Sequence, residues 1–595
     1  MTIFAGIVAR SKSVAVVDSS RAALRRLISR FPGESVQEFG DENFCLVKVD
    51  LGAYGSPGAF VDAEGSISLL AGEPYLVTRP QDIGNARYAD LQQLHGDVIS
   101  KKWNAFGRCA GTFCMMHYHP ATGTLCLIAD KFGVRPIYYW IGPQFVVFAT
   151  ALRILEQLTE VVKVVDLRGL GEAACFGFSL ADRTPYEDVR TIRECEIIAM
   201  SGDTEARHVY WRWDRLEATG KSSSEAAERA HQRFAVAIRR RLKGDKTVAA
   251  FLSGGLDSRA IVSMLRSLQV TVHTTNWAKS GTQDQVFGAE IALKLGSIHQ
   301  VTPERRERVG DPYKKLGVRD WLQSELVKKS PLDRSQLVWS GDGGSVGVGH
   351  VYLNPKMVEH MEQGLTGEAI QEFLAHNKCS LPRRPFKATV ASAMSRIPEE
   401  GIRDELERLE CSDQGRKLHL FLMFNDQRRH LADLYENIDL ERIEFLLPFF
   451  DADFLESVLA NPIFDCLQHK FYMKWLEHFA PVVTQVAWQA YPGHAPCPIR
   501  QDGFGYQWSR DTGPEARREQ RETTMRYLRL ISAGAKFPSD LISRTPVLSA
   551  ALATLLGVRD YSYVLKPVAV FCKHWNISDG KWSGHIPRFG TLSEL

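Results

Sequence analysis

The spacing of hydrophobic and polar positions changes near residue 215. Before that point, short apolar runs alternate with turns rich in Gly, Pro and Asp, as at 44–49, 125–129 and 145–149. Such runs predict β-strands, so the first part of the chain is expected to be a sheet-rich domain. We place its end at residue 212, before the polar stretch 220–224, which can serve as a linker and as the N-cap of the next helix.

After this linker the pattern becomes strand–helix alternation. The fully apolar run 248–252 is typical of a strand buried in a parallel sheet, and a glycine turn and a helix over 259–268 follow it. A strand over 270–275, a further helix and a strand ending at Trp339 continue the alternation. This pattern predicts a doubly wound α/β domain, which binds ligands at the carboxyl ends of its strands.

Three units are therefore expected, with boundaries at 1–212, 213–500 and 501–595. The segment from Met357 to about His430 should be mostly helical, and it has no internal repeats. The last unit is expected to be an extension that packs on the second.

Composition narrows the class of protein without identifying it. Hydrophobic residues make up 44% and charged residues 24% of the 595 residues, which excludes a disordered or fibrous chain. The net charge of +3 argues against a nucleic-acid or membrane-surface partner. There is no secretory signal and no apolar stretch of the ~20 residues that span a bilayer. The 11 cysteines form no CxxC pair, so free thiols in a reducing cytoplasm are expected.

The strongest chemical signal is the stretch Ser253-Gly254-Gly255-Leu256-Asp257-Ser258. It lies where a strand hands over to a helix, so its glycines allow an anion to approach the backbone and the helix N-terminus attracts negative charge. The serines add hydroxyl donors, and Asp257 offers a hard oxygen ligand for Mg²⁺. The stretch therefore predicts a site for a nucleotide pyrophosphate with its metal. It lacks Gly-Lys-Ser/Thr and is not a Walker loop.

This stretch resembles the pyrophosphate loop of ATP pyrophosphatases, and the rest of the chain is similar to the asparagine synthetase/β-lactam synthetase superfamily. The matching segments follow the family's order and are 130–139, 148–152, 182–186, 340–344 and 444–451. The resemblance implies an N-terminal glutaminase-like domain of the Ntn-hydrolase type, with αββα layers. It also implies a C-terminal doubly wound ATP-pyrophosphatase domain with helical additions, and ATP and Mg²⁺ as cofactors.

The glutaminase-like part departs from that family at the positions that would use glutamine. Ala5 stands where the family has its N-terminal cysteine nucleophile, and 71–73 and 110–111 have lost the family's Asn and Asp. Thr2 is an alternative nucleophile in principle, but it lies three residues too early. The resemblance therefore implies that this domain makes no ammonia.

Two segments resemble the lasso peptide cyclases of this superfamily, namely 340–352 and 488–498. The second contains no lysine, although relatives carry a catalytic lysine there, and Ser345 stands where relatives have a magnesium-binding aspartate. This likeness implies an AMP- and pyrophosphate-forming ligase. It would adenylate an Asp or Glu side chain of a linear precursor peptide and close a macrolactam with the N-terminal amine. A leader peptidase and a leader-recognition protein would be its partners.

Other functions remain open from the sequence. One alternative is a β-lactam-type or ammonia-dependent asparagine synthetase-like amide ligase that acts on a small molecule. Another is an ATP-binding scaffold without activity. The intact 253–258 loop argues against a scaffold, and the missing lysine argues against a small-molecule ligase.

The candidate site residues follow from these motifs. Asp257 and Asp342 are the predicted metal ligands; Glu444 is the predicted general base beside Asp342, unless it pairs with an arginine such as Arg442. His494 and Tyr491 are candidate acid–base groups or turn residues, and Asp284 is either a ligand or a helix N-terminal acid. The predicted nucleotide-binding residues are Leu252, Ser253, Gly254, Gly255, Asp257, Ser258, Asn276, Trp277 and Gly341.

Overall fold

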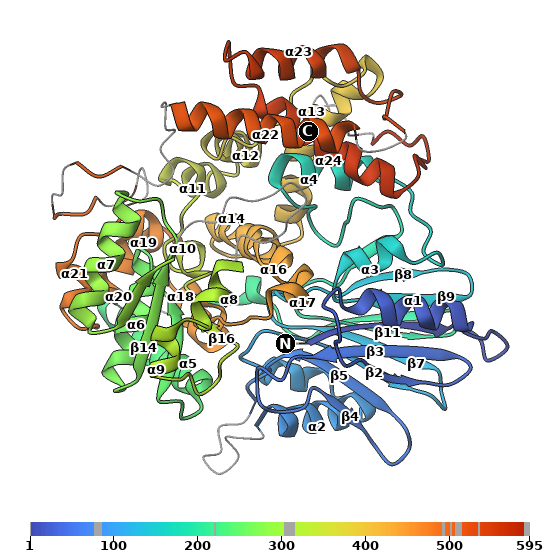
Figure 1. The fold of residues 1–595 in the computed structure, drawn as a ribbon, viewed down its shortest axis with the longest axis horizontal. Helices are drawn as coiled ribbons and strands as arrows, with labels where there is room; N and C mark the ends of the chain where they lie inside the picture. Colours follow the sequence, from blue (N-terminus) through green and yellow to red (C-terminus); the bar gives the residue numbers. More distant parts are fainter. Residues whose placement is uncertain are drawn as a thin grey trace.

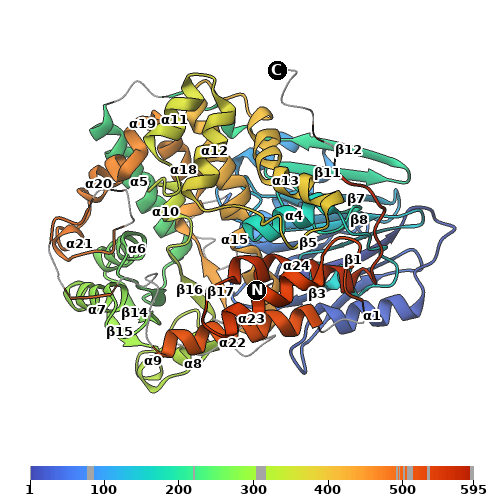
Figure 2. The ribbon, with the colours of Figure 1, turned by 90° about the horizontal axis from the view of Figure 1, so that it is seen from above.

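A computed structural model describes residues 2–76, 86–218, 222–302, 316–490, 494, 496–499, 503–505, 514–532, 536–587 and 589. Figure 1 shows two stacked sheets in the N-terminal part, another sheet flanked by helices beside them, and a group of C-terminal helices that covers one side of both parts. Figure 2 shows the same arrangement from above.

The N-terminal part contains two six-stranded antiparallel sheets. In spatial order, the first is β10 (Val189–Thr191), β8 (Tyr138–Ile141), β9 (Phe145–Ala149), β1 (Thr2–Ala9), β3 (Phe44–Asp50) and β2 (Gln37–Gly40). The second is β12 (Thr204–Val209), β11 (Glu196–Ser201), β7 (Thr124–Ala129), β6 (Phe113–His119), β5 (Ile67–Gly72) and β4 (Ala59–Val61).

Strand β1 explains why this part has four layers. Its side chains alternate: Phe4 and Val8 enter the core between the two sheets, whereas Ile3, Ala5 and Ile7 belong to the core on the other face. Both faces are buried because helices cover the outer sides. These helices are α1 (Asp18–Ile28) and α3 (Leu152–Gln157) on the first sheet and α2 (Ala86–Ile99) on the second. The predicted αββα layering is confirmed.

The second part is built on a five-stranded parallel sheet. Its spatial order is β15 (Ile298–Val301), β14 (Thr271–Asn276), β13 (Thr247–Phe251), β16 (Leu337–Trp339) and β17 (Glu444–Leu446). The chain runs outward from β13 to β15 and then returns to the other side of β13. This topological switch point lies between β13 and β16, where doubly wound sheets bind ligands. The predicted doubly wound domain is confirmed.

Helices α6 (Leu256–Ser267) and α7 (Gln283–Leu295) pack on this sheet, and α6 also packs against both α7 and α5 (Ser223–Leu242). Ser222 caps α5 through a reciprocal capping box with Glu225, so the polar stretch after the first part does start a helix. The shorter helices of this part are α8 (Leu316–Leu322), α9 (Glu325–Lys329), α10 (Gly344–Gly347), α15 (Arg428–His430), α16 (Ala432–Glu436), α17 (Ile438–Glu441), α18 (Ala452–Leu459), α19 (Ile463–Cys466), α20 (Lys470–Leu476) and α21 (Val482–Gln485).

A helical region links β16 to β17. It contains α11 (Pro355–Glu362), α12 (Thr366–His376), α13 (Ala388–Glu407), α14 (Gln414–Phe421) and a π-helix, η4 (Leu422–Gln427). Short 3₁₀ turns elsewhere are η2 (Trp103–Arg108), η3 (Trp213–Arg215), η5 (Pro448–Phe450) and η6 (Leu467–His469).

The C-terminal helices are α22 (Pro514–Ser532), α23 (Arg544–Leu555) and α24 (Ser562–Ile577). They share an apolar core with α13 and with α4 (Leu167–Phe176) of the N-terminal part. The extension therefore packs on both parts of the chain, and not on the synthetase part alone as the sequence suggested. Among the described residues, no helix is long and apolar enough to cross a membrane.

Candidate functional site

The 253–258 loop follows β13 directly and lies at the switch point. The Ser253 N–H donates to the Ser258 Oγ at 3.0 Å, and the Gly254 N–H donates to the Asp284 Oδ1 at 2.8 Å. A Cβ atom at Gly254 would come within 2.8 Å of the Asp284 backbone, so only glycine fits there. Gly255 is the N-cap of α6 and brings no capping side chain. The N-terminus of this helix therefore remains open toward an anion.

Arg259 places a positive charge directly behind this loop. Its side chain is fully buried and donates to five carbonyl oxygens, those of Gly254, Gly255, Val483, Val486 and Ala487, at 2.9–3.0 Å. Burial lowers the pKa of Arg259 to about 10, so it stays charged at neutral pH. All its donors bind neutral carbonyls, and its charge therefore remains available to attract a phosphate chain. Arg259 lies outside the 253–258 motif and was not among the predicted site residues, although an arginine on an otherwise apolar helix face is visible in the sequence.

The Asp257 carboxylate is held by two hydroxyl groups. The Ser345 Oγ donates to Oδ2 at 2.6 Å, and the Tyr472 hydroxyl donates to Oδ1. Burial raises the pKa of Asp257 to about 6, against the opposing effect of these two hydrogen bonds. Tyr472 lies 215 residues away in the sequence, and no motif pointed to it. We call Ser345, Tyr472 and Asp257 the hydroxyl clasp.

Asp342 and Gly341 lie beside the clasp. A Cβ atom at Gly341 would come within 3.0 Å of the Asp257 Cβ, so the two loops touch. Ser340 Oγ donates to the Asp342 Oδ2 at 2.6 Å, and His430 Nε2 lies 3.9 Å from the other oxygen. Asp342 also contributes to the raised pKa of Asp257 through like-charge repulsion. The structure thus brings the two predicted metal ligands together.

The remaining predicted nucleotide residues have structural contacts of their own. Leu252 is buried and its N–H donates to the Thr275 carbonyl. Asn276 donates to the Asp284 carbonyl and accepts from the Ala278 N–H, so its side chain fixes the loop after β14. Trp277 packs edge-to-face on Phe251 with ring centroids 4.7 Å apart. Asp284 is the first-turn acid of α7, one of the two roles considered for it, and it also accepts the Gly254 N–H; its role as a metal ligand stays a prediction.

Glu444 pairs with an arginine from the other part of the chain. The Arg135 Nη2 donates to the Glu444 Oε1 at 2.6 Å, and both side chains are buried. The expected pairing with Asp342 is not observed, because Glu444 starts β17 opposite Leu337 whereas Asp342 follows the far end of β16. Arg442, the arginine considered beforehand, binds Glu34 instead. The Glu444 Oε2 is buried and has no hydrogen-bond partner within the described ranges.

His494 is half-buried and lies against the ring of His469, with centroids 4.4 Å apart. Burial lowers the pKa of His494, and it lowers the pKa of His469 to about 3. His469 packs on Tyr472 and has a left-handed backbone with φ of 64°. His494 is therefore connected through two rings to the clasp. Tyr491 lies outside the described residues.

The positions in the N-terminal part that would use glutamine are buried or paired with residues of the protein itself. Ala5 is fully buried in the middle of β1, paired with Val47 and Ala149. Glu73 binds the Tyr75 hydroxyl at 2.6 Å and forms an ion pair with Lys243 of α5's C-terminal cap. Burial alone would raise the pKa of Glu73, but the Lys243 ammonium outweighs it and lowers this pKa.

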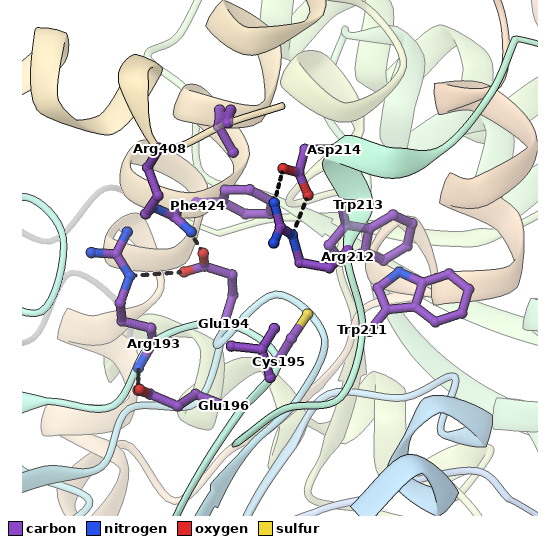
Figure 3. A pocket seen from close by; sticks show the side chains of 12 residues that line it. Arg193, Glu194, Cys195, Glu196, Trp211, Arg212, Trp213, Asp214, Arg408 and Phe424 are labelled. Carbon is purple, nitrogen blue, oxygen red and sulfur yellow. Dashed lines mark hydrogen bonds and ion pairs between the residues drawn. The ribbon is translucent and has the colours of Figure 1, made fainter. Parts of the chain in front are cut away.

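A cleft of about 390 Å³, its open mouth included, lies between the two parts and away from the 253–258 loop. Figure 3 shows Arg193 and Arg408 pointing toward Glu194, and Arg212 toward Asp214. The Arg408 Nη2 lies 2.7 Å from the Glu194 Oε1, and the Arg212 Nη2 lies 2.6 Å from the Asp214 Oδ2. Because these arginines are neutralised by carboxylates of the protein itself, we assign the cleft to domain packing and not to substrate binding.

The residues around the clasp fit a magnesium ion only in part. Asp257 and Asp342 supply hard oxygen ligands. Within the described ranges, no group of three or more His, Cys, Asp or Glu side chains is arranged to hold a metal. Magnesium keeps several waters and commonly takes its other ligands from phosphates, so two carboxylates suit an ion that arrives with a nucleotide.

Comparison with known protein families gives two matches. Residues 99–211 match the glutamine amidotransferase domain family, and residues 229–316 match the asparagine synthase family. The first match begins after Ala5 and Glu73. The second includes the 253–258 loop and Asn276 but ends before Asp342 and Glu444.

Curated relatives agree with these matches. "Amidase chry2" of Gibberella zeae is 25% identical over 322 residues, which cover 50% of this chain and 44% of that protein. A putative glutamine-hydrolyzing asparagine synthetase of Methanocaldococcus jannaschii is 24% identical, covering 42% of this chain and 52% of the relative. Asparagine synthetase 3 of Bacillus subtilis is 26% identical, covering 30% and 29%. The chain thus aligns with about half or less of each relative's length.

These matches establish the domain types. An N-terminal glutamine amidotransferase-type domain precedes an asparagine synthase domain, in agreement with the αββα layers and the doubly wound sheet.

Proposed function

We propose that this chain, which carries the two domains of asparagine synthetases, is an ATP-dependent ligase that forms amide bonds and releases AMP and pyrophosphate. The observation that carries the proposal is the 253–258 loop at the switch point, backed by the buried Arg259, which has no ion pair with a carboxylate among the described residues. Backbone N–H groups, hydroxyls and a buried guanidinium suit a pyrophosphate leaving group.

We further propose that the amine does not come from glutamine. An amidotransferase of this type uses an N-terminal cysteine whose own amine assists the thiol. Ala5 has no nucleophilic atom, and its nitrogen is part of a peptide bond inside β1. The Lys243–Glu73 ion pair also occupies the pocket where glutamine would be bound.

The proposed substrate is a linear precursor peptide, as in lasso peptide maturation. An Asp or Glu side chain attacks the α-phosphorus of ATP, which releases pyrophosphate and leaves an acyl-adenylate. The peptide's N-terminal amine then attacks the acyl carbon, AMP departs, and one proton is released from the nitrogen. The product is an isopeptide-linked macrolactam. The sequence likeness of 340–352 and 488–498 to cyclases supports this choice.

Roles for individual residues follow from their positions. Ser253, Gly254, Gly255 and Ser258 bind the phosphates, and Asp257 and Asp342 would hold Mg²⁺, which neutralises phosphate charge when bound. Glu444 is the proposed acceptor of the amine proton, because Arg135 holds one carboxylate oxygen while Oε2 has no partner within the described ranges. His494 and Tyr491 are proposed to border the reacting centre.

The cellular setting is proposed on the same basis. A leader-recognition protein and a leader peptidase would deliver the trimmed peptide, in the cytoplasm, where ATP is available. Neither nucleic acid nor membrane is required.

The test is isotope tracing with a linear, leader-free peptide whose acidic side chain carries ¹⁸O in both oxygens. The proposal expects AMP with one ¹⁸O and a peptide that is lighter by one labelled water. Asp257→Asn should abolish both, and Asp203→Asn, a change at an exposed acid, should not. Label in inorganic phosphate, or ADP as the product, would contradict the proposal. AMP formed only with free amino acids and ammonium would favour the small-molecule amide ligase instead.

A further inference from the structure

Helix α23 is apolar on two opposite faces. Val547, Ala550 and Ala551 are buried against the neighbouring helices α22 and α24. On the other face, Leu548, Leu552 and Leu556 are 60%, 59% and 66% exposed. Figure 1 shows α23 at the outer edge of the C-terminal helices. A helix that is apolar all round is normally buried on all sides, so this second face lacks a cover within the described chain.

The exposed leucines form a ridge with the spacing that a second helix recognises. Leu548, Leu552 and Leu556 follow one another at four-residue intervals, the row along which helices interdigitate. Beside them, Ser549 and Ala553 have small side chains, which allow another helix to approach closely. A partner helix could therefore pack its own apolar side chains between the leucines.

Basic side chains surround this ridge. Arg544 begins α23, Arg559 follows its end, and both are exposed. Arg521 is exposed on α22 and donates to the Leu555 carbonyl at 3.1 Å. α23 contains no acidic residue, and α22 carries five arginines against three glutamates. Asp560 is the acid next to Arg559, and with Arg521, Arg544 and Arg559 the rim of the apolar ridge still carries a net positive charge.

We propose that this face of α23, the leucine ridge, binds an amphipathic helix of a partner protein that has apolar positions at i, i+4 and i+8 and acidic residues beside them. Charge complementarity selects this occupant. A second copy of this chain would bring Arg521, Arg544 and Arg559 toward their own counterparts. The helix of 12 residues is also too short to bury by itself the ~1,200 Å² of a stable interface between two copies.

The test uses the full chain and two fluorescent synthetic peptides of about 20 residues, long enough to form helix. Both carry leucines at three positions four apart; one has glutamates on the flanks and the other has lysines. The proposal expects the acidic peptide to bind at least about tenfold more tightly than the basic one by fluorescence anisotropy, and to weaken as salt rises.

Matched variants locate the binding. Leu552→Ser should weaken the acidic peptide about tenfold, whereas Leu293→Ser, at a residue that is 80% exposed on α7, should leave its affinity unchanged. The double change Arg521→Glu and Arg559→Glu should shift the preference toward the basic peptide. Thermal unfolding of each variant should match the wild type, since these side chains are exposed.

Several results would overturn the proposal. The proposal is wrong if the two peptides bind with equal affinity, or if Leu552→Ser leaves the binding of the acidic peptide unchanged. It is also wrong if the chain dimerises in sedimentation, or co-sediments with phosphatidylserine vesicles, and Leu552→Ser abolishes that association; the face would then belong to a second copy or to a membrane. None of these binding measurements requires adenylation activity, so a failure of the proposed function would leave the outcome of this test unchanged.

Discussion

The pockets of the two domains differ in how their charges are balanced. In the glutaminase-like pocket, Glu73 pairs with Lys243 and Arg135 pairs with Glu444, and both pairs join one domain to the other. At the 253–258 loop, the Arg259 guanidinium donates to five carbonyl oxygens, and no carboxylate among the described residues forms an ion pair with it. Burying a charge is costly unless it is compensated, so the open charge at the loop is balanced best by an anionic ligand.

This difference distinguishes a contact between two domains from a ligand-binding site. Where every charge cancels within the protein, as in the Glu73–Lys243 pair, the contact holds two domains in register and offers nothing to a ligand. Glu444 differs from that pair, because its Oε2 has no hydrogen-bond partner within the described ranges. Where a charge is left open beside a helix N-terminus, phosphate is the natural partner. The cleft around Glu194 belongs to the first kind, since each of its arginines meets a carboxylate.

The largest effect is expected from Asp257→Asn. It keeps the size of the side chain but removes the charge that the clasp holds, so AMP formation should fall by at least about 100-fold. The measurement is AMP release with peptide and ATP. Unfolding should change little, because one of the two hydroxyls can still donate to the amide oxygen while the other accepts from the amide NH₂. Activity near the wild-type level would remove Asp257 from the site.

Next in size is Arg259→Gln. The change leaves several buried carbonyls without donors and should lower the free energy of unfolding by about 3 kcal/mol. It should also weaken ATP binding, since the open charge is lost. Arg266→Gln, in the same helix and also bound to carbonyls, serves as the control for urea unfolding and ATP titration. Equal ATP affinity in the two variants would show that the charge of Arg259 does not attract the phosphates.

Acid should weaken the contact between the two domains at Glu405, whose carboxylate accepts two hydrogen bonds from Arg193. Burial alone would raise the pKa of Glu405, but Arg193 and Arg408 outweigh it and lower this pKa to about 2, from an ordinary value of 4.5. The depressed pKa stabilises the fold above pH 4.5, and this contribution disappears as the pH falls toward 2.

Glu405→Gln should therefore lower the free energy of unfolding by up to about 3 kcal/mol at pH 7, and the gap to the wild type should shrink in acid. Urea unfolding at several pH values measures this difference in the free energy of unfolding. Glu410→Gln, at an exposed acid, is the control. A gap that stays constant with pH would contradict the assignment.

A smaller change is expected from Ser345→Asp. The Ser345 Oγ lies 2.6 Å from the Asp257 Oδ2, so a second carboxylate there would meet the first. The variant should bind free Mn²⁺ about tenfold more tightly, because two neighbouring carboxylates bind a divalent cation more strongly than one. Calorimetry without nucleotide measures this affinity. Ser340→Asp, on the neighbouring loop, controls for added charge. Unchanged Mn²⁺ affinity would show that the clasp does not set metal binding.

The smallest effect is expected from Ala5→Cys. A thiol at this position is buried within β1 and has no terminal amine to assist it, so glutamine hydrolysis should stay at the blank level. Glutamate release is the measurement, and Ala5→Ser is the matched control. Glutamate release by the cysteine variant alone would mean that the pocket still accepts glutamine.

The sequence predicted the parts of the site that are local. The period of apolar residues located β13 and α6, and the glycine and serine positions gave the phosphate loop, because strand, turn and helix N-terminus are adjacent in the chain. The predicted helix over 259–268 is α6, which begins three residues earlier at Leu256.

Contacts between residues far apart in the chain could not be predicted from the sequence. Tyr472 meets Asp257, and Arg135 meets Glu444, only after the sheets and domains have packed. No spacing rule connects such residues. The expected Asp342–Glu444 pair failed for the same reason, since strand order and register decide which end of β16 each carboxylate occupies.

The central claim is that ATP drives amide formation here without glutamine. One reaction tests it directly: the chain with ATP, Mg²⁺, a linear leader-free peptide and glutamine labelled with ¹⁵N in its amide, analysed for AMP, glutamate and peptide mass. The account predicts AMP together with a peptide lighter by one water, no glutamate above the blank and no ¹⁵N in the product. Glutamate released in step with AMP, with ¹⁵N in the product, would contradict it.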